Sequence, residues 1–273
     1  MGETKVIEPV TRLEGHAKIT IHLNDNNQVE DARFHVTEFR GYESFVKGRP
    51  FWEMPDITSR ICGICPVSHH LGSAKAGDGL VGAEIPEAAE KLRRLMHMGQ
   101  ILQSHALSFF YLSSPDLILG HESDPKKRNI VGLLEENPDL AKKGVKLRSL
   151  GQTVIQALGK KKVHPEFAIP GGVNKNLARD DGEELLEKSK SAPEDLIETI
   201  DVLEEVYENL GEEMLECAVQ ETGYMGLVTE EDGLEHYDGK IRLTGKDGDQ
   251  LEKFEGSEYD SIINERSKDW SYL

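Results

Sequence analysis

Alternating apolar and polar residues near the N-terminus predict a small antiparallel sheet. Three stretches alternate in this way, Val6–Pro9, Ala17–Leu23 and Ala32–Glu38. A period of two residues is typical of strands that bury one face. The polar run Asn24–Asn27 lies between the last two stretches. We therefore expect these two strands to form a hairpin.

Beyond residue 65 the apolar positions follow a helical spacing. A helix is predicted to begin at Pro66–Ser68, since proline is tolerated in a first helical turn. A long helix is predicted over Pro86–Leu112, and further helices over Asp139–Lys160 and Glu183–Leu210, the last interrupted at Ala192–Pro193. The apolar face of the long helix contains Leu92, Leu95, Met96, Gly99, Leu102 and Leu107.

Together these elements predict an α+β fold, mainly a helical bundle with a small N-terminal antiparallel sheet. A β-hairpin is expected as an insertion at Gly239–Glu255, where two short apolar stretches flank a glycine-rich turn. The sequence contains no internal repeat and no low-complexity linker. We therefore expect residues 1–273 to form a single domain.

Charge and cysteine content narrow the classes of function. The net charge of −18 argues against nucleic-acid binding, which requires basic surface. Most of the acidic residues follow Asp180 and are expected on solvated helix faces. No stretch of eighteen apolar residues and no signal peptide occur, and three cysteines favour a reducing compartment. A cytoplasmic protein without a membrane span is expected.

Two of the three cysteines form a CxxC motif at Cys62 and Cys65, and His69 follows four residues later. Such a pair of thiols suits structural zinc, thiol redox chemistry or another metal. Structural zinc requires four protein ligands, and Cys217 has no cysteine or histidine near it. A redox CxxC typically follows a buried strand, whereas Phe51–Ser59 is polar and contains a proline. The motif alone leaves all three alternatives open.

Further motifs accompany the CxxC in a fixed order. They are RLEGH at residues 12–16, RGYE at 40–43, RICGICPVSHH at 60–70 and HPEFAIPGG at 164–172. This ordered set resembles the large subunit of nickel-iron hydrogenases. The phrases are most similar to the cytoplasmic, archaeal branch, which includes the methyl-viologen-reducing hydrogenase that works with heterodisulfide reductase. The resemblance extends over essentially the whole chain and is most specific between residues 7 and 76.

The resemblance implies a role for each of five residues. Cys62 would be a terminal nickel ligand, and Cys65 would bridge nickel to an iron that also carries carbonyl and cyanide ligands. His69 would donate a hydrogen bond to the bridging sulfur. Glu14 would relay protons beside the nickel thiolates, and Glu43 would bind a buried magnesium or iron ion. Apart from the motifs, a solvated charge is the ordinary role of either glutamate, and a helix-start cap or core position that of the histidine.

These roles agree with the chemistry of the side chains. Soft thiolates stabilise nickel, and hard carboxylate oxygens suit magnesium. A carboxyl group can take the proton released when dihydrogen is split, and burial raises its pKa toward neutrality. Cys65 at the positive end of a helix dipole favours its thiolate. The predicted sheet would bring Glu14 and the loop after Glu38 to the CxxC.

One departure from the family pattern limits the expected activity. The family carries a second motif, Asp-Pro-Cys-x-x-Cys-x-x-His, that supplies two more thiolates. The chain lacks this motif, since Asp124–Pro125 is followed by Lys126–Arg128. We expect the chain alone not to be a competent hydrogenase. Three explanations stay open: a truncated protein, a fragment, or one half of a split subunit whose C-terminal part is a separate fragment. It also has no cysteine set for iron-sulfur clusters, so an iron-sulfur small subunit is an implied partner.

Two other functions remain as alternatives. A catalytically inert relative could retain the fold as an interaction subunit, like the quinone-module subunit of respiratory complex I. A zinc or thiol-redox module would leave the other motifs unexplained.

The roles of several further charged and polar residues stay open. Arg12, Arg40 and Arg60 could serve either as surface charge or as partners of buried groups. His16 and His70 are open between packing, hydrogen bonding and proton transfer.

Overall fold

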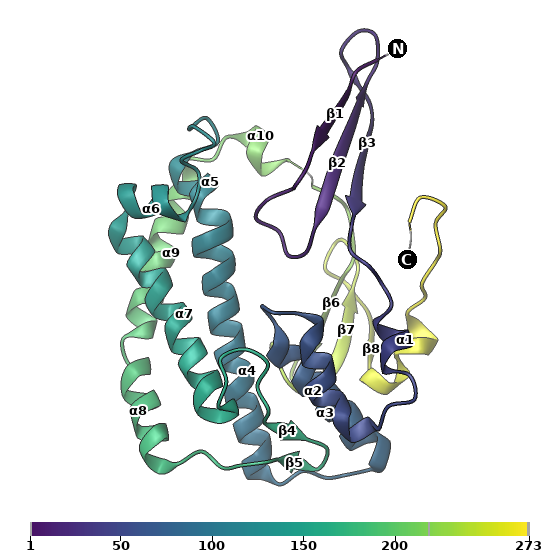
Figure 1. Cartoon of the computed structure of the whole chain (residues 1–273), viewed down its shortest axis with the longest axis vertical. Helices are drawn as coiled ribbons and strands as arrows, with labels where there is room; N and C mark the ends of the chain where they lie inside the picture. Colours follow the sequence, from purple (N-terminus) through teal and green to yellow (C-terminus); the bar gives the residue numbers. More distant parts are fainter. Residues whose placement is uncertain (1, 218, 272–273) are drawn as a thin grey trace. The chain divides into compact units, whose positions relative to one another are not determined.

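The computed structural model describes residues 2–217 and 219–271 (Figure 1). It consists of two compact units, Met1–Val206 and Tyr207–Leu273. The division does not test the expected single family domain, which stays a prediction. In the described part of the chain, no helix is both long and apolar enough to span a membrane.

The first unit begins with a three-stranded antiparallel sheet. Its strands are β1 (Thr4–Ile7), β2 (Ala17–Leu23) and β3 (Val29–Val36), in the order β1-β2-β3. The bounds predicted for β2 are confirmed, whereas β1 and β3 begin two and three residues earlier than predicted. The turn after β2 is closed by Asn24, whose side-chain oxygen accepts the backbone amides of Asn26 and Gln28 at 2.9 and 3.0 Å.

Helices make up most of the first unit. They are α1 (Tyr42–Val46), α2 (Met54–Thr58), α3 (Pro66–Val81), α4 (Glu87–Leu107), α5 (Ser114–Leu119), α6 (Ile130–Glu136), α7 (Pro138–Gly159), α8 (Arg179–Ser189) and α9 (Ala192–Glu208). A π-helical turn, Ser108–Ser113, connects α4 to α5, and 3₁₀ turns occupy Phe51–Glu53 and Ser59–Ile61. The predicted helices are confirmed, including the start of α3 at Pro66, but some bounds differ. Helix α4 ends five residues earlier than predicted, α8 begins four residues earlier, and the predicted break lies at residues 190–191, just before Ala192.

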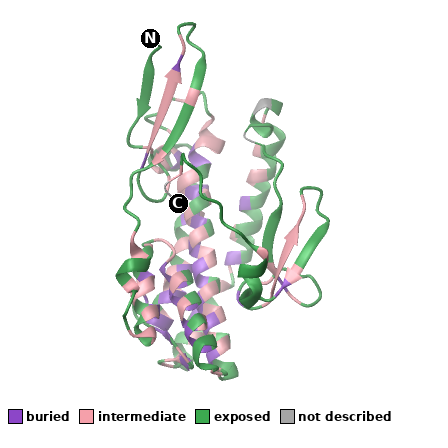
Figure 2. Cartoon of the chain, turned by 90° about the vertical axis from the view of Figure 1, so that its right-hand side faces the viewer, coloured by how far each residue is buried: buried purple, intermediate pink, exposed green. Residues whose placement is uncertain are grey.

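Helices α4 and α7 pack closely along their length. A Cβ atom placed on Gly151 would lie 2.5 Å from the Gly99 carbonyl oxygen, so the two backbones approach at positions that only glycine allows. Next to this contact, Met96 packs with Ile155 and Leu158, all at most 1% exposed. Burying such side chains is the main stabilising contribution to a domain. Figure 2 shows that many of the buried residues lie in the helical body of the first unit.

A two-stranded ribbon, β4 (Ala168–Ile169) and β5 (Gly172–Val173), follows α7 and is held by a buried ion pair. Arg93 of α4 is fully buried and pairs with Asp78 of α3 at 2.6 Å. Its guanidinium also donates to the carbonyls of Ile169 at 2.7 Å and Gly172 at 2.8 Å. Asp78 in turn accepts the backbone amide of Gly171 at 2.6 Å. One buried pair thus joins two helices to the ribbon.

The second unit contains another three-stranded antiparallel sheet. Its strands are β6 (Tyr224–Val228), β7 (Lys240–Thr244) and β8 (Gln250–Phe254), in the order β6-β7-β8. Two one-turn helices, α10 (Glu212–Leu215) and α11 (Tyr259–Ile262), and a 3₁₀ turn at Gly256–Glu258 complete the unit. The predicted hairpin is the β7–β8 pair, and β6 was not predicted. The α+β class, with a helical body and small antiparallel sheets, is confirmed.

Candidate metal site

The CxxC lies in the loop between the 3₁₀ turn Ser59–Ile61 and α3. Cys62 is extended, and Cys65 is the N-cap residue of α3, which has proline in its first turn. The loop folds back on itself, because the backbone amide of Cys65 donates to the Cys62 sulfur at 3.2 Å. The two sulfur atoms lie 2.7 Å apart, and both cysteines are free and partly buried. The thiols therefore face the same small volume.

His69 completes a cluster of three possible metal ligands. It lies four residues after Cys65 on α3, a spacing that places both side chains on one helix face. Ligand atoms of Cys62, Cys65 and His69 all lie within 4.8 Å of one another. Within residues 2–217 and 219–271, this is the one group of three or more such side chains with that spacing. Two soft thiolates beside an imidazole suit nickel, iron or zinc.

Glu14 approaches this cluster from the loop between β1 and β2. Its carboxylate oxygen lies 3.6 Å from the Cys62 sulfur, although 48 residues separate them in the sequence. The loop turns at Gly15, whose φ of +84° favours glycine. Arg12 anchors the loop by pairing with Asp116 of α5 at 2.7 Å. The structure thus brings together four of the five predicted site residues.

Burial and neighbouring groups make Cys65 a weak acid. Burial raises the pKa of the Cys65 thiol to about 12, with further contributions from the hydrogen bond to Cys62 and from the charges of Cys62 and Glu14. The start of α3 acts in the opposite direction but does not outweigh them. A bound cation removes this penalty by stabilising the thiolate, so metal binding at this site releases a proton.

Glu43, the fifth predicted residue, lies apart from the three-residue cluster. It is an exposed residue in α1, and Arg40 pairs with it at 3.0 Å. A backbone hydrogen bond and the Arg40 side chain lower the pKa of Glu43, so its carboxylate is ionised. The metal role expected for Glu43 stays a prediction.

Among the residues left open by the sequence, His70 has the clearest position. Its buried ring accepts the backbone amides of Phe167 and Ala168 at 3.2 and 2.8 Å, and its other nitrogen donates to the Pro55 carbonyl at 2.8 Å. This arrangement requires the neutral imidazole, and burial lowers the pKa of His70 accordingly. His70 therefore joins α2 and α3 to Phe167 and to the first residue of β4 by hydrogen bonds.

The other open residues make surface contacts. His16 is exposed and hydrogen-bonds the carboxylate of Glu38. Arg60 lies 4.0 Å from Asp56, and both side chains are about half exposed. Exposed pairs of this kind contribute little to stability.

Two glutamines beside the site were missed from the sequence. Gln100 and Gln103 of α4 are buried, and both donate to the carbonyl oxygen of Ile64, inside the CxxC, at 3.1 and 3.0 Å. Their position in the sequence could have indicated a structural role. They fall between Met96 and Ala106 on the buried side of the helix, where polar side chains require a hydrogen-bond partner. Arg93 on the same helix carried the same signal.

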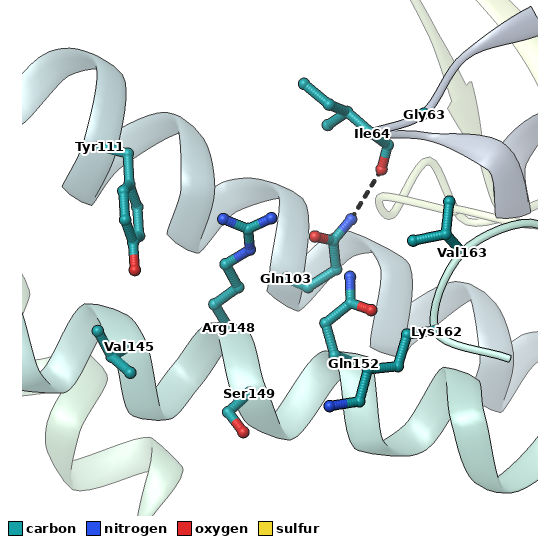
Figure 3. A pocket seen from close by; sticks show the side chains of 10 residues that line it. All are labelled: Gly63, Ile64, Gln103, Tyr111, Val145, Arg148, Ser149, Gln152, Lys162 and Val163. Carbon is teal, nitrogen blue, oxygen red and sulfur yellow. Dashed lines mark hydrogen bonds between the residues drawn. The ribbon is translucent and has the colours of Figure 1, made fainter.

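A pocket of about 350 Å³ lies behind the CxxC loop. Gly63 and Ile64 form part of its wall, and side chains of α4 and α7 extend into it, as Figure 3 shows. The full lining is Gly63, Ile64, Gln103, Tyr111, Val145, Arg148, Ser149, Gln152, Lys162 and Val163. These lining residues include two cations and no carboxylate.

Comparison with known proteins places this arrangement in a family. A HoxL-like family model matches residues 5–39, and the nickel-dependent hydrogenase model matches residues 40–129. A vhu polypeptide of the F420-non-reducing hydrogenase from Methanocaldococcus jannaschii is 43% identical over 269 residues, which are 98% of this chain and 64% of that protein. The chain belongs to the nickel-dependent hydrogenase large-subunit family. The family predicted from the motifs, with its archaeal members, is thus confirmed.

Other members of the hydrogenase family are similar as well. The NAD-reducing hydrogenase HoxS subunit beta of Cupriavidus necator is 41% identical over 285 residues, covering all of this chain and 58% of that protein. The crystal structure of an NAD⁺-reducing [NiFe]-hydrogenase in the H₂-reduced state superimposes with a TM-score of 0.93 at 42% identity, over 99% of this chain and 60% of that one. The chain therefore spans about three fifths of the length of these hydrogenase relatives.

Proposed function

We propose that this chain is the N-terminal part of a nickel-iron hydrogenase large subunit that catalyses the reversible oxidation of dihydrogen. The observation that carries the proposal is the cluster of Cys62, Cys65 and His69 with the Glu14 carboxylate 3.6 Å from the Cys62 sulfur. A soft-metal site with a proton acceptor in contact with a ligand sulfur is what heterolytic chemistry requires.

The donor set fits part of a nickel-iron centre. Cys62 is proposed as a terminal nickel ligand, and Cys65 as a bridge to an iron that carries carbonyl and cyanide ligands. The chemistry that such a centre supplies when bound is the splitting of dihydrogen into protons and electrons. Two further thiolates are needed, and we assign them to polypeptide outside this chain. Glu43 is proposed to bind a magnesium or iron ion.

Within the site, the protein residues hold and move the proton. The Cys62 sulfur accepts it, and Glu14, an exposed residue in contact with that sulfur, then carries it toward solvent. His69 holds its ring beside the two sulfurs and tunes their basicity. The electrons are proposed to pass to the iron-sulfur clusters of a small subunit, which in turn reduce a heterodisulfide-reductase type of acceptor in the cytoplasm.

Zinc binding is the second candidate, because two cysteines and one histidine within 4.8 Å also form three corners of a tetrahedral zinc site. Metal analysis separates the candidates. The chain is purified together with the polypeptide that completes the large subunit, and bound metals are quantified beside the infrared bands of carbonyl and cyanide ligands. Nickel and iron with these bands support the hydrogenase proposal. Zinc alone supports the second candidate, and no metal supports an inert relative.

Serine variants test whether the cluster carries the metal. We expect Cys62→Ser and Cys65→Ser to lose nickel, because a serine hydroxyl is a hard and weakly acidic ligand. Cys217→Ser is the matched control, since Cys217 is an exposed free cysteine in the second unit. Full nickel content in either cluster variant would contradict the proposal.

A further inference from the structure

One peptide unit in the CxxC loop is held at both of its polar ends. The Ile64 carbonyl oxygen accepts hydrogen bonds from Gln100 and Gln103, at 3.1 and 3.0 Å, and Figure 3 shows the second of these bonds. The amide nitrogen of the same peptide belongs to Cys65 and donates to the Cys62 sulfur at 3.2 Å. The plane of peptide 64–65 therefore links α4 to a proposed metal ligand.

Both glutamines are buried and donate to the same carbonyl oxygen. Gln100 and Gln103 are 3% and 1% exposed and lie three residues apart on α4, so their amides reach the same carbonyl from one helix face. The Gln100 side-chain oxygen has no hydrogen-bond partner in the described part of the chain. Burying an oxygen without a hydrogen-bond partner destabilises the fold. The bond from the Gln100 amide nitrogen to Ile64 is therefore formed at the expense of some stability.

We propose that Gln100 and Gln103 are positioning residues that set the charge on the Cys62 sulfur through peptide 64–65. Two donors on one carbonyl fix the peptide plane, which aims the Cys65 amide at the sulfur. They also polarise the peptide, since hydrogen bonds in series strengthen one another. The stronger N–H···S bond withdraws electron density from the Cys62 thiolate and thereby from the metal it binds. The inference rests on the proposed function only in taking Cys62 as a metal ligand.

The first test uses the metal-free full chain. Gln100→Met and Gln103→Met remove the donor and keep the length of the side chain. Amide hydrogen exchange at Cys65, followed by NMR, is expected to accelerate about fivefold in each variant and about twentyfold or more in the double variant. Gln152→Met is the control, because Gln152 lines the same pocket from α7 without bonding Ile64. Unchanged exchange at Cys65 in variants that keep the wild-type helical circular dichroism would overturn the proposal.

The second test reads the sulfur directly. With Co²⁺ as the probe, the thiolate-to-cobalt charge-transfer band is expected to shift to lower energy in the two variants and to stay in place in Gln152→Met. A role confined to folding would leave the band unmoved, and that result would also overturn the proposal. If the wild-type chain binds no Co²⁺, the assignment of Cys62 as a ligand fails, while the exchange experiment still decides whether the glutamines fix the peptide.

Discussion

Replacing Arg93 with methionine should lower the free energy of unfolding of the first unit. The loss should be much larger than for an exposed arginine on the same helix. The guanidinium is fully buried, pairs with Asp78 at 2.6 Å and donates to the carbonyls of Ile169 and Gly172. Methionine fills much of the volume but leaves a largely buried carboxylate and two carbonyl oxygens without this partner. Breaking a buried pair from one side costs about 3–5 kcal/mol.

The neighbouring Arg94 provides a matched control. It lies on the same helix and pairs with Glu90 one turn away, with both side chains about one third exposed. Removing such a pair costs about 0.3–0.5 kcal/mol. Urea unfolding followed by circular dichroism compares Arg93→Met with Arg94→Met on the same chain. Since Asp78→Asn removes the stranded charge, the double variant with Arg93→Met should lose less stability than the sum of the single variants, by about 1–3 kcal/mol.

Two results would refute this reasoning. If Arg93→Met lowers the free energy of unfolding by less than about 1 kcal/mol, then water or rearrangement replaces the guanidinium. The buried groups would then not be left without a partner, and the expected cost would not arise. Strict additivity in the double variant would mean that Asp78 and Arg93 contribute independently. Either outcome would remove the ion pair as the element that joins α3, α4 and the ribbon.

Three further predictions concern the proton acceptor, the helix contact and a helix cap. Glu14→Gln should leave the nickel content of the completed hydrogenase unchanged and lower hydrogen–deuterium exchange activity about a hundredfold or more; equal activity would exclude Glu14 as the relay, and Glu38→Gln is the control. Gly151→Ala should destabilise the first unit by about 1–3 kcal/mol in urea unfolding, because its Cβ would lie 2.5 Å from the Gly99 oxygen. Gly72→Ala, where nothing lies within 4 Å, should instead stabilise α3 by about 0.5–1 kcal/mol, and the opposite order would contradict the packing described. Asn137→Ala should cost about 1 kcal/mol in the same assay, since the Asn137 side chain caps α7 by accepting the Leu140 amide at 3.2 Å; no loss would show that water replaces the cap.

The elements with a strong hydrophobic period could be predicted from sequence. The bounds of β2 and the body of α7 followed from alternation and from helical spacing, because each element carries its own pattern. Strand β6 (Tyr224–Val228) was missed, since its residues are mostly exposed and its partner β7 is supplied by a later segment. The bounds of β1 differed for the same reason: hydrogen bonds to a neighbouring strand determine where a strand begins.

The candidate site, too, could be predicted from the sequence only in part. The motifs predicted the residues that gather around Cys62, and the structure brings Glu14, Cys65 and His69 to it. The buried glutamines of α4 that donate hydrogen bonds to the CxxC loop were not predicted. Gln100 bonds a residue 36 positions away, and no local pattern of one sequence specifies a partner at that distance. A buried amide can be suspected from its helix face, but its partner requires the fold.

The contacts that hold the segment before and within the ribbon have a consequence for how its sequence can change. His70, Asp78 and Arg93 all bind main-chain atoms between Phe167 and Gly172, and none of these bonds uses a side chain of the segment. Substitution of an outward residue such as Ile169, which is 43% exposed, leaves every one of these bonds in place. The segment can therefore accept new surface chemistry while its path through the molecule stays the same, which makes it a suitable position for introducing labels or altered contacts.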